Sequence, residues 1–251
     1  MTKKLRSFLL LSSGIVIIGL TACGGGTKGK MDSSDTSASA VVDKALMRAA
    51  NQTTAQGMNA EGLRILETIY KRNPKDPEAA MKFARGLREM NELTKAAIIL
   101  EPFVNDPDSP SALKLEYAAT QLEAGRYERA EEVARAAVKQ NPLSGFGYHI
   151  LGTALDAQGL HEQSEKAFRE ALKNWVGDPV PVMNNLALSL TAQEKLDEAH
   201  EILLQAKAAD PSRIEIERNL RIINALRETS ISTPNPAGRT QAPMPLDIHS
   251  N

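Results

Sequence analysis

The chain has 251 residues, with 30 Lys and Arg against 31 Asp and Glu, and a formal net charge of -1. Hydrophobic residues make up 42%, so a packed core is expected, and the length allows one or two domains. The balanced charge and the 4% of aromatic residues give neither the basic surface nor the stacking rings of nucleic-acid-binding proteins. The single Cys excludes an intramolecular disulfide, a four-cysteine zinc site and a CxxC redox pair.

The first residues have the pattern of an export signal. Lys3, Lys4 and Arg6 precede an apolar run over residues 8–20. The run is too short to span a bilayer, which needs about 20 residues, but it suits the apolar region of a signal peptide.

A possible lipidation site follows this run. The segment Leu20-Thr21-Ala22-Cys23 resembles the lipobox of bacterial lipoproteins, in which the Cys is acylated. The resemblance implies cleavage after Ala22 and a membrane anchor through lipid on Cys23. Gly24, which stands where Asp would signal retention at the inner membrane, favours the outer membrane and its periplasmic face. The alternative is an ordinary secretory signal with an incidental Cys.

The composition predicts four segments. Residues 1–22 form the signal peptide, and residues 23–40, rich in Gly, Ser, Thr and Ala, form the lipidated Cys and a flexible tether. Residues 41–229 form the folded domain. Residues 230–251 contain four Pro and no apolar period, which predicts a disordered tail. The tail is either solvated or a docking segment for a partner.

The folded domain repeats with a period of about 34 residues. Gly125-Arg126-Tyr127 aligns with Gly159-Leu160-His161 at an offset of 34, and Ala130 aligns with Ala199 at an offset of 69. Five units are expected, followed by a single helix from about Arg213 to Glu228. The units begin near Asp43, Pro77, Ser111, Gly145 and Val180.

Each unit is predicted to contain two helices, because apolar residues recur at helical spacing and not in alternation. Asp76-Pro77, Ser109-Pro110 and Asp178-Pro179 each place a capping side chain before a Pro at the first helical position. Gly125 and Gly159 lie between helices, where a left-handed residue ends the first helix. Glu194 occupies this position in the fifth unit, so a strained or altered turn is expected there.

Small residues are predicted at the helix crossings, where larger side chains would overpack the contact. These residues, with the two turn glycines, are Ala118, Gly125, Ala130, Gly152, Gly159, Ala187 and Ala199. Pro102, late in the second helix of unit two, should kink or end that helix.

The pattern resembles the tetratricopeptide repeat over about residues 43–228. The third and fourth units carry most of it, through Ala118, Gly125, Tyr127, Ala130, Ala137 and Pro142, then Tyr148, Leu151, Gly152, Gly159, Phe168 and Ala171. The resemblance implies an all-α fold: a superhelix, or α-solenoid, of about five helix pairs and a C-terminal capping helix.

In this family the first helices line a groove that binds segments of other proteins. The residues projected onto that groove are Arg85, Arg88, Leu115, Leu122, Phe146, His149, Asn184 and Leu188. Arg85 and Arg88 lie one turn apart and could pair with one acidic group of a partner. The alternative is that some of these residues pack within the chain.

The groove lacks the Lys and Asn clamp with which chaperone-binding members of the family hold a C-terminal carboxylate. The matching positions are Met47, Met81, Leu115, His149 and Asn184. The sequence also lacks metal-ligand spacing among its four His, a GxSxG nucleophile motif and a phosphate-binding loop. We therefore expect no enzyme, no metal and no small-molecule substrate, and no cofactor beyond the covalent lipid on Cys23.

A narrower resemblance concerns the C-terminal part of the repeats. Asn184-Asn185-Leu186-Ala187-Leu188, residues 196–199 and 209–211, and Asn219-Leu220 resemble the lipoproteins of tight-adherence (Tad/Flp) pilus assembly. This implies an outer-membrane scaffold in cell-envelope assembly, with the pilus secretin or other assembly proteins as partners. A type IV pilus secretin pilotin, or a periplasmic scaffold for peptidoglycan enzymes or proteases, would have similar features.

Overall fold

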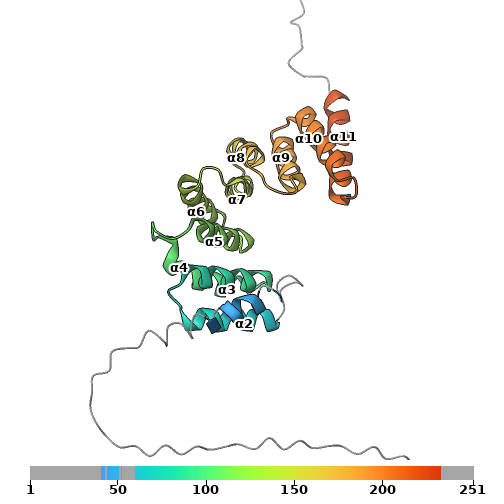
Figure 1. The fold of residues 1–251 in the computed structure, drawn as a ribbon. Helices are drawn as coiled ribbons and strands as arrows, with labels where there is room; N and C mark the ends of the chain where they lie inside the picture. The colour runs from blue at the N-terminus through green and yellow to red at the C-terminus, as the bar shows by residue number, and fades with distance from the viewer. Residues whose placement is uncertain (1–40, 43, 51, 53–59, 233–251) are drawn as a thin grey trace, which may run out of the picture. The chain divides into compact units, whose positions relative to one another are not determined.

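A computed structural model describes residues 41–42, 44–50, 52 and 60–232 (Figure 1). The predicted signal peptide, Cys23, the tether and the tail beyond residue 232 lie outside the described residues. The chain divides into a unit up to Val41 and a unit from Val42 onward, and the description below concerns the second unit. No helix in its described part is both long and apolar enough to cross a membrane.

Within the described ranges, the regular secondary structure is entirely helical. Residues 41–42, 44–50 and 52 are helical and precede the first complete helix. The helices that follow are α2 (Ala60–Arg72), α3 (Pro77–Glu89), α4 (Leu93–Val104), α5 (Ser111–Glu123), α6 (Tyr127–Gln140), α7 (Gly145–Asp156), α8 (His161–Lys173), α9 (Val180–Ala192), α10 (Leu196–Ala209) and α11 (Ile214–Ser232).

The helices stack as repeated pairs. Each helix packs against the next one in the chain, and the first helices α3, α5, α7 and α9 also contact one another in succession. The expected unit starts at Pro77, Ser111, Gly145 and Val180 are the first residues of these four helices. The predicted fold class is confirmed: the chain is an all-α solenoid of helix pairs.

The turn inside each pair has the same form in four units. Asn91, Gly125, Gly159 and Glu194 have φ values of 61, 73, 75 and 61°. In each turn the next residue's N–H bonds back to the carbonyl five residues earlier, for example Lys195 N to Leu190 O at 3.0 Å. This Schellman bond closes the helix end. The fifth turn is therefore unaltered in form, and Glu194 itself adopts the left-handed conformation that disfavours a side chain.

The caps before the first helices differ from the prediction in two places, at α5 and at α9. Asp76 accepts a bond from Glu78 N at 3.0 Å and Pro77 begins α3. Asp178 accepts from Val180 N at 3.0 Å, but Pro179, expected at the first helical position, is the N-cap residue of α9. In α5 the N-cap residue is Pro110, which has no side-chain acceptor, so α5 begins without a side-chain cap and the predicted cap by Ser109 is wrong.

Small residues lie at close helix crossings. Ala118, Ala130, Ala187 and Ala199 are fully buried. A Cβ atom added to Gly152 would lie 2.7 Å from the ring of Phe168 on α8. Any side chain at this position would therefore have to displace α8 or the Phe168 ring.

Pro102 neither prevents α4 nor bends it into two helices. It is the tenth of the twelve residues of α4, which ends two residues later at Val104. The expected early end of this helix therefore falls just after the proline.

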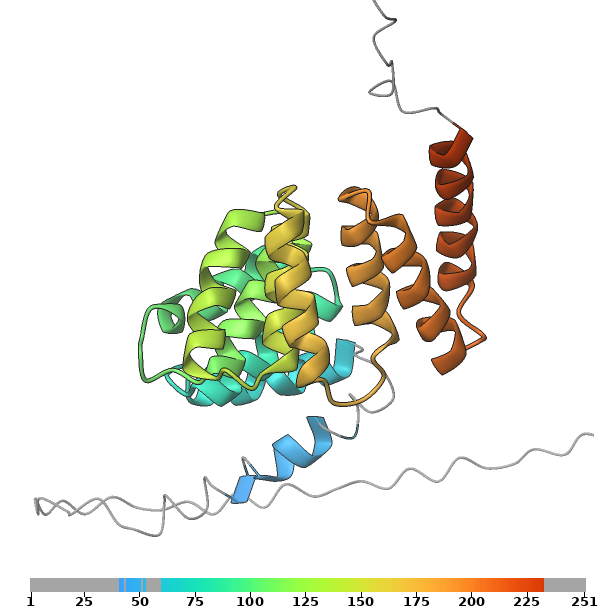
Figure 2. The same ribbon diagram turned by 90° about the horizontal axis from the view of Figure 1, so that it is seen from above.

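Two hydrophobic clusters form the interior. The N-terminal cluster runs from Ala50 through helices α2 to α7 and ends at Ala167 on α8. The C-terminal cluster begins at the neighbouring Phe168 and includes Leu186, Leu203 and Ile223 from α9, α10 and α11. Tyr148 on α7 packs against both clusters, so α7 and α8 form the boundary between them. In Figure 2, α9 to α11, in orange to red, follow the yellow α8.

Helix α11 closes the stack with a polar side. Ala187 and Leu190 of α9 are fully buried. The residues 34 positions later, Arg221 and Asn224 of α11, are exposed. Helix α11 thus buries Ile216, Leu220 and Ile223 against the preceding repeat and presents polar groups where another helix would otherwise pack.

Candidate protein-interaction site

We call the exposed side of α3, α5, α7 and α9 the first-helix face; it comprises Arg85, Arg88, Leu122, Phe146, His149, Asn184, Asn185 and Leu188. Phe146 and Leu188 are its exposed apolar residues, at 50% and 42% of full exposure. Leu122 is half-buried. Leu115, predicted to line the groove, is buried at 5% and belongs to the N-terminal cluster. The prediction that Leu115 lines the groove is therefore wrong, because its side chain packs in the core.

Arg85 and Arg88 bind an acidic group within the chain. Their Nε atoms lie 2.8 and 2.7 Å from the two carboxylate oxygens of Glu116 on α5, which is 2% exposed. Arg88 also reaches Glu123 at 2.5 Å. The two arginines were predicted to share one acidic group of a partner; they share Glu116 of the next repeat instead. This ion-pair cluster fastens α3 to α5.

Burial disfavours the charge on Arg88, but the hydrogen bonds and charges of Glu116 and Glu123 outweigh that effect and raise its pKa. Arg88 therefore remains charged. The side chain of Arg85 is 49% exposed, against 19% for that of Arg88. Arg85 is the arginine of the pair that a partner can reach.

His149 lies among rings and an amide. Its ring is 5.4 Å from that of Trp175, edge-on, and 5.9 Å from that of Phe168. Its Nε2 atom is 3.1 Å from Nδ2 of Asn185 on α9. Burial lowers the pKa of His149, because the surroundings disfavour an imidazolium. His149 therefore connects α7 with the loop after α8 and with α9.

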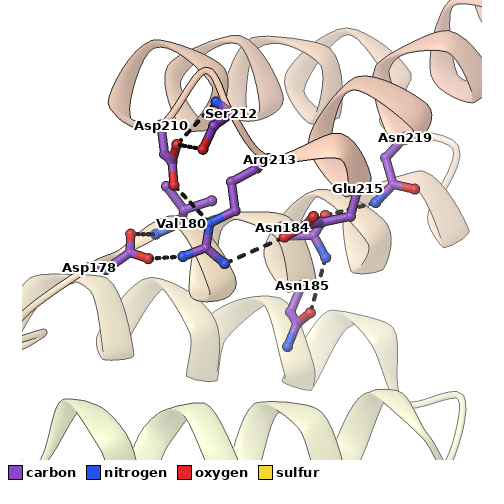
Figure 3. A network of polar contacts seen from close by, with 9 residues as sticks. All are labelled: Asp178, Val180, Asn184, Asn185, Asp210, Ser212, Arg213, Glu215 and Asn219. Carbon is purple, nitrogen blue, oxygen red and sulfur yellow. Dashed lines mark hydrogen bonds and ion pairs between the residues drawn. The ribbon is translucent and has the colours of Figure 1, made fainter.

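Asparagine side chains continue this contact toward the C-terminus. Asn184 Nδ2 donates to Asn185 Oδ1 at 3.4 Å, and Asn219 Nδ2 of α11 donates to Asn184 Oδ1 at 2.7 Å (Figure 3). Together with His149, these amides link α7, α9 and α11 by side-chain hydrogen bonds. Asn184 and His149, both projected onto the groove, are thus half-buried members of one polar network.

A second part of the network ties the inter-repeat loops together. Arg213 forms ion pairs with Asp210 (3.0 Å), Glu215 (3.4 Å) and Asp178, which also caps α9 (Figure 3). Sequence reasoning missed this role of Arg213, since its partners lie up to 35 residues away. The only available signal was its position beside the capping residue Asp210.

A shallow apolar hollow lies at the edge of the first-helix face. Its volume is about 310 Å³, and its lining includes Leu143, Phe146, Trp175 and Val176. Leu143 and Val176 are 75% and 93% exposed. The indole N–H of Trp175 donates to Asp178 O at 2.7 Å, which fixes the ring at this rim. Phe146 therefore belongs to both the first-helix face and the hollow.

The first-helix face and the hollow offer apolar contact surface, hydrogen-bonding groups and charge. Among the described residues, no cluster of three or more His, Cys, Asp or Glu is placed to hold a metal ion. His161 pairs with Asp156, with 2.8 Å between Nδ1 and Oδ1. The chemistry of the site is the binding of other groups by packing, hydrogen bonds and charge.

Comparison with known proteins identifies the repeats. Residues 150–214 match the family model described as a tetratricopeptide repeat. None of the curated proteins compared with the sequence matches it significantly.

Solved structures share the fold. A thermophilic tetratricopeptide-repeat protein from Thermus thermophilus superposes with a TM-score of 0.61 and 20% identity, over 73% of this chain and 99% of that chain. MamA, residues 41 to the end, from Desulfovibrio magneticus RS-1 superposes with a TM-score of 0.57 and 19% identity, over 68% of this chain and 97% of that chain. The chain thus shares the stacked helix-pair fold of these structures, and its residues 150–214 match the tetratricopeptide repeat.

Proposed function

We propose that this protein is a lipid-anchored scaffold on the periplasmic face of the outer membrane, where its repeats hold proteins of Tad/Flp pilus assembly, in particular the secretin. The observation that carries the scaffold function is the exposure of Phe146 and Leu188 on the first-helix face. Phe146 also lines the hollow with Leu143, Trp175 and Val176. A contiguous exposed apolar patch of this kind marks an interaction surface.

The chemistry around these two residues defines the partner segment. Helices α7 and α9 contain no Lys or Arg, and Asp156 is their single acidic residue. Asp156 pairs with His161. An extended or helical segment with apolar side chains and few charges fits this part of the face, because charged side chains would lose water there without finding an opposite charge.

Membrane attachment is proposed from the lipobox-like segment ending at Cys23. Two or more acyl chains hold a protein stably at a bilayer, since one chain alone binds only marginally. A tether of residues 24–40 would leave the repeats free to meet partners in the periplasm.

The pilus system is proposed from the resemblance to the Tad/Flp lipoprotein TadD. Several resembling residues fasten the last three helices together. Asn184 bonds to Asn219, and Asp197 of α10 accepts from Nε of Arg227 at 2.8 Å. Asn184, Asp197 and Asn219, which belong to the resembling segments, thus help to attach α11 to the preceding repeat in this chain.

Substitution on the first-helix face tests the binding function. The variant Phe146→Asp/Leu188→Asp should lose at least tenfold in affinity for the secretin in a pull-down or calorimetric titration, because each carboxylate would be desolvated in the contact. Leu204→Asp is the matched control, since Leu204 is also 42% exposed but lies on the second helix α10. Unchanged binding by the double variant, with normal helical content by circular dichroism, would place the partner surface elsewhere.

Two experiments in cells test the membrane anchor and the pilus assignment separately. Cys23→Ser should release the protein from the outer-membrane fraction and abolish palmitate labelling. Deletion of the gene should remove surface pili and lower the amount of assembled secretin. Normal piliation in the deletion strain would contradict the pilus role while leaving the scaffold function open to other partners.

A further inference from the structure

The hydrogen bonds from α11 to α7 all point in one direction. Asn219 donates to Asn184 at 2.7 Å, Asn184 donates to Asn185 at 3.4 Å, and the Asn185 amide nitrogen meets His149 Nε2 at 3.1 Å. An amide nitrogen is only a donor, so Nε2 must accept, and the ring of His149 carries its proton on Nδ1. The direction of the whole series is therefore set at its last member.

We propose that protonation of His149 reverses this series of amides and so switches the polar pattern of the first-helix face. The biological use of the switch rests on the proposed scaffold function, but the switch itself needs no partner. We call the four residues His149, Asn185, Asn184 and Asn219 the amide relay.

The reversal follows from the number of donors. A protonated imidazole has N–H groups at both ring nitrogens, so Nε2 would face the Asn185 NH2 group, donor against donor. Asn185 restores the bond by rotating its amide to offer Oδ1. Its NH2 group then faces that of Asn184, which must rotate in turn, and Asn219 must follow. All three hydrogen bonds are kept, with every donor and acceptor exchanged.

The exchange matters for binding because Asn184 is half-buried at the first-helix face. A partner group that accepts a hydrogen bond in one state of the relay meets an acceptor in the other. Such a mismatch leaves a polar group without a partner in the contact, which weakens binding. A proton on α7 can therefore change recognition at α9.

The charged residues of α5, α7 and the loop after α8 are paired with other side chains, so His149 is the group whose protonation would reverse the relay. Burial is the single cause of its lowered pKa. Helix α9 has no charged residue, and Asp156 of α7 and Asp178 of the loop are paired with His161 and Arg213. On α5, Glu116 and Glu123 bind Arg85 and Arg88, and Lys114 bonds to Gln140.

The charges of α8, which presents Phe168 to the ring, are also accounted for. Glu165 and Arg169 pair with each other and with Lys195 and Glu198, and Lys173 pairs with Glu170. Glu162 and Lys166 are exposed. His149, at the end of the relay, therefore has no unpaired charged residue of α8 beside it.

The pH window follows from the direction of the shift. The pKa of His149 is lowered from its ordinary value of 6.5, so the unfolded chain binds a proton at a higher pH than the folded one. The neutral relay is favoured above about pH 6.5, and the stability it gives is lost as the pH falls from there through the folded pKa. Reversal therefore occurs below pH 6.5.

The test is an NMR titration of the full chain from pH 7.5 to 4.5 without any partner. The side-chain NH2 signals of Asn185, Asn184 and Asn219 should shift with the same midpoint as the ring signals of His149. His161 is the internal control: its titration should leave the three amides unchanged. Amide signals that stay constant, or that follow the midpoint of His161, would overturn the proposal.

Two variants locate the connection. Asn185→Ala removes the middle of the relay, so His149 should still titrate while Asn219 loses its response. His149→Phe keeps a ring among Trp175 and Phe168 but removes the proton, so all three amides should lose their pH dependence. A response of Asn219 that persists in Asn185→Ala would overturn the relay. Failure of partner binding in the earlier experiments would leave these results unaffected, so the two proposals are tested separately.

Discussion

The two hydrophobic clusters are built on one repeat, but their neighbouring first helices are fastened by different chemistry. In the N-terminal cluster, Arg85 and Arg88 of α3 hold Glu116 of α5 by ion pairs. In the C-terminal part, Asn219 of α11 holds Asn184 of α9 by a neutral hydrogen bond. The difference teaches that the repeat dictates the packed interior, where small and apolar residues recur, and leaves the first-helix face free to vary.

The boundary between the clusters combines features of both. Ile150 and Leu151 of α7 belong to the N-terminal cluster, while His149 of the same helix contacts Trp175 and Asn185. The loop that follows α8 contains Gly177 with φ of 99°, a conformation open to glycine. The two clusters are therefore joined by α7, α8 and the loop that contains Gly177. We expect a cavity-creating substitution in one cluster to destabilise that cluster more than the other.

The largest expected effect comes from cavities placed in each cluster. Leu100 of α4 and Leu203 of α10 are both fully buried. Either residue changed to Ala should lower the free energy of unfolding by about 2–5 kcal/mol, through lost burial and the remaining cavity. Leu203→Ala should reduce amide hydrogen-exchange protection mainly in α9 to α11, and Leu100→Ala mainly in α3 to α6. Equal loss of protection throughout both variants would mean that the clusters unfold as one unit.

A smaller effect tests the ionic fastening. Glu116→Gln keeps the shape of the side chain but removes its charge and one of its two acceptor oxygens. One charge-assisted bond to an arginine therefore weakens, and the other is lost because the Gln NH2 group cannot accept a hydrogen bond. The free energy of unfolding should fall by about 2 kcal/mol, measured by urea denaturation. Glu123→Gln is the control: its side chain is 44% exposed, and its exposed pair should contribute less than about 1 kcal/mol. A Glu116→Gln variant as stable as the original would show that the ion pairs contribute nothing net.

The smallest expected effect is a gain of stability in the C-terminal part. Glu194 has φ of 61° and an exposed side chain in the same turn that Gly125 and Gly159 form elsewhere. Glu194→Gly should raise the free energy of unfolding by about 0.5–1 kcal/mol, because glycine adopts this conformation without a Cβ clash. Gly159→Ala, the converse change, should lower it by a similar amount. A melting temperature that falls in Glu194→Gly would contradict the strain at this residue.

The fold could be predicted from the sequence because the repeat fixes it at many positions. The starts of α3, α5, α7 and α9 follow from a 34-residue spacing with one longer interval. Buried positions such as Ala187 and Ala199 also recur with that spacing. Packing in a solenoid involves neighbouring repeats only, so a periodic pattern contains most of the information that the interior requires.

The first-helix face could be predicted only in part. Phe146 and Leu188 are exposed, but Leu115, at a position equivalent to that of His149, points into the core. Arg85 and Arg88 find Glu116, 31 and 28 residues away. Such partners depend on the angle between adjacent helices and on side-chain length, and neither quantity is periodic in the sequence. Face residues are therefore free to form internal pairs that no repeat pattern reveals.

The polar outer side of α11 sets the length of the molecule. Arg221 and Asn224 of α11 occupy the positions equivalent to Ala187 and Leu190 of α9. Ala187 and Leu190 are fully buried, whereas Arg221 and Asn224 are exposed. Because a new helix pair would have to bury that guanidinium and that amide, further repeats cannot be added after α11 without changing both residues. Duplication of a helix pair is therefore more easily accommodated upstream of α11, where the equivalent positions are buried.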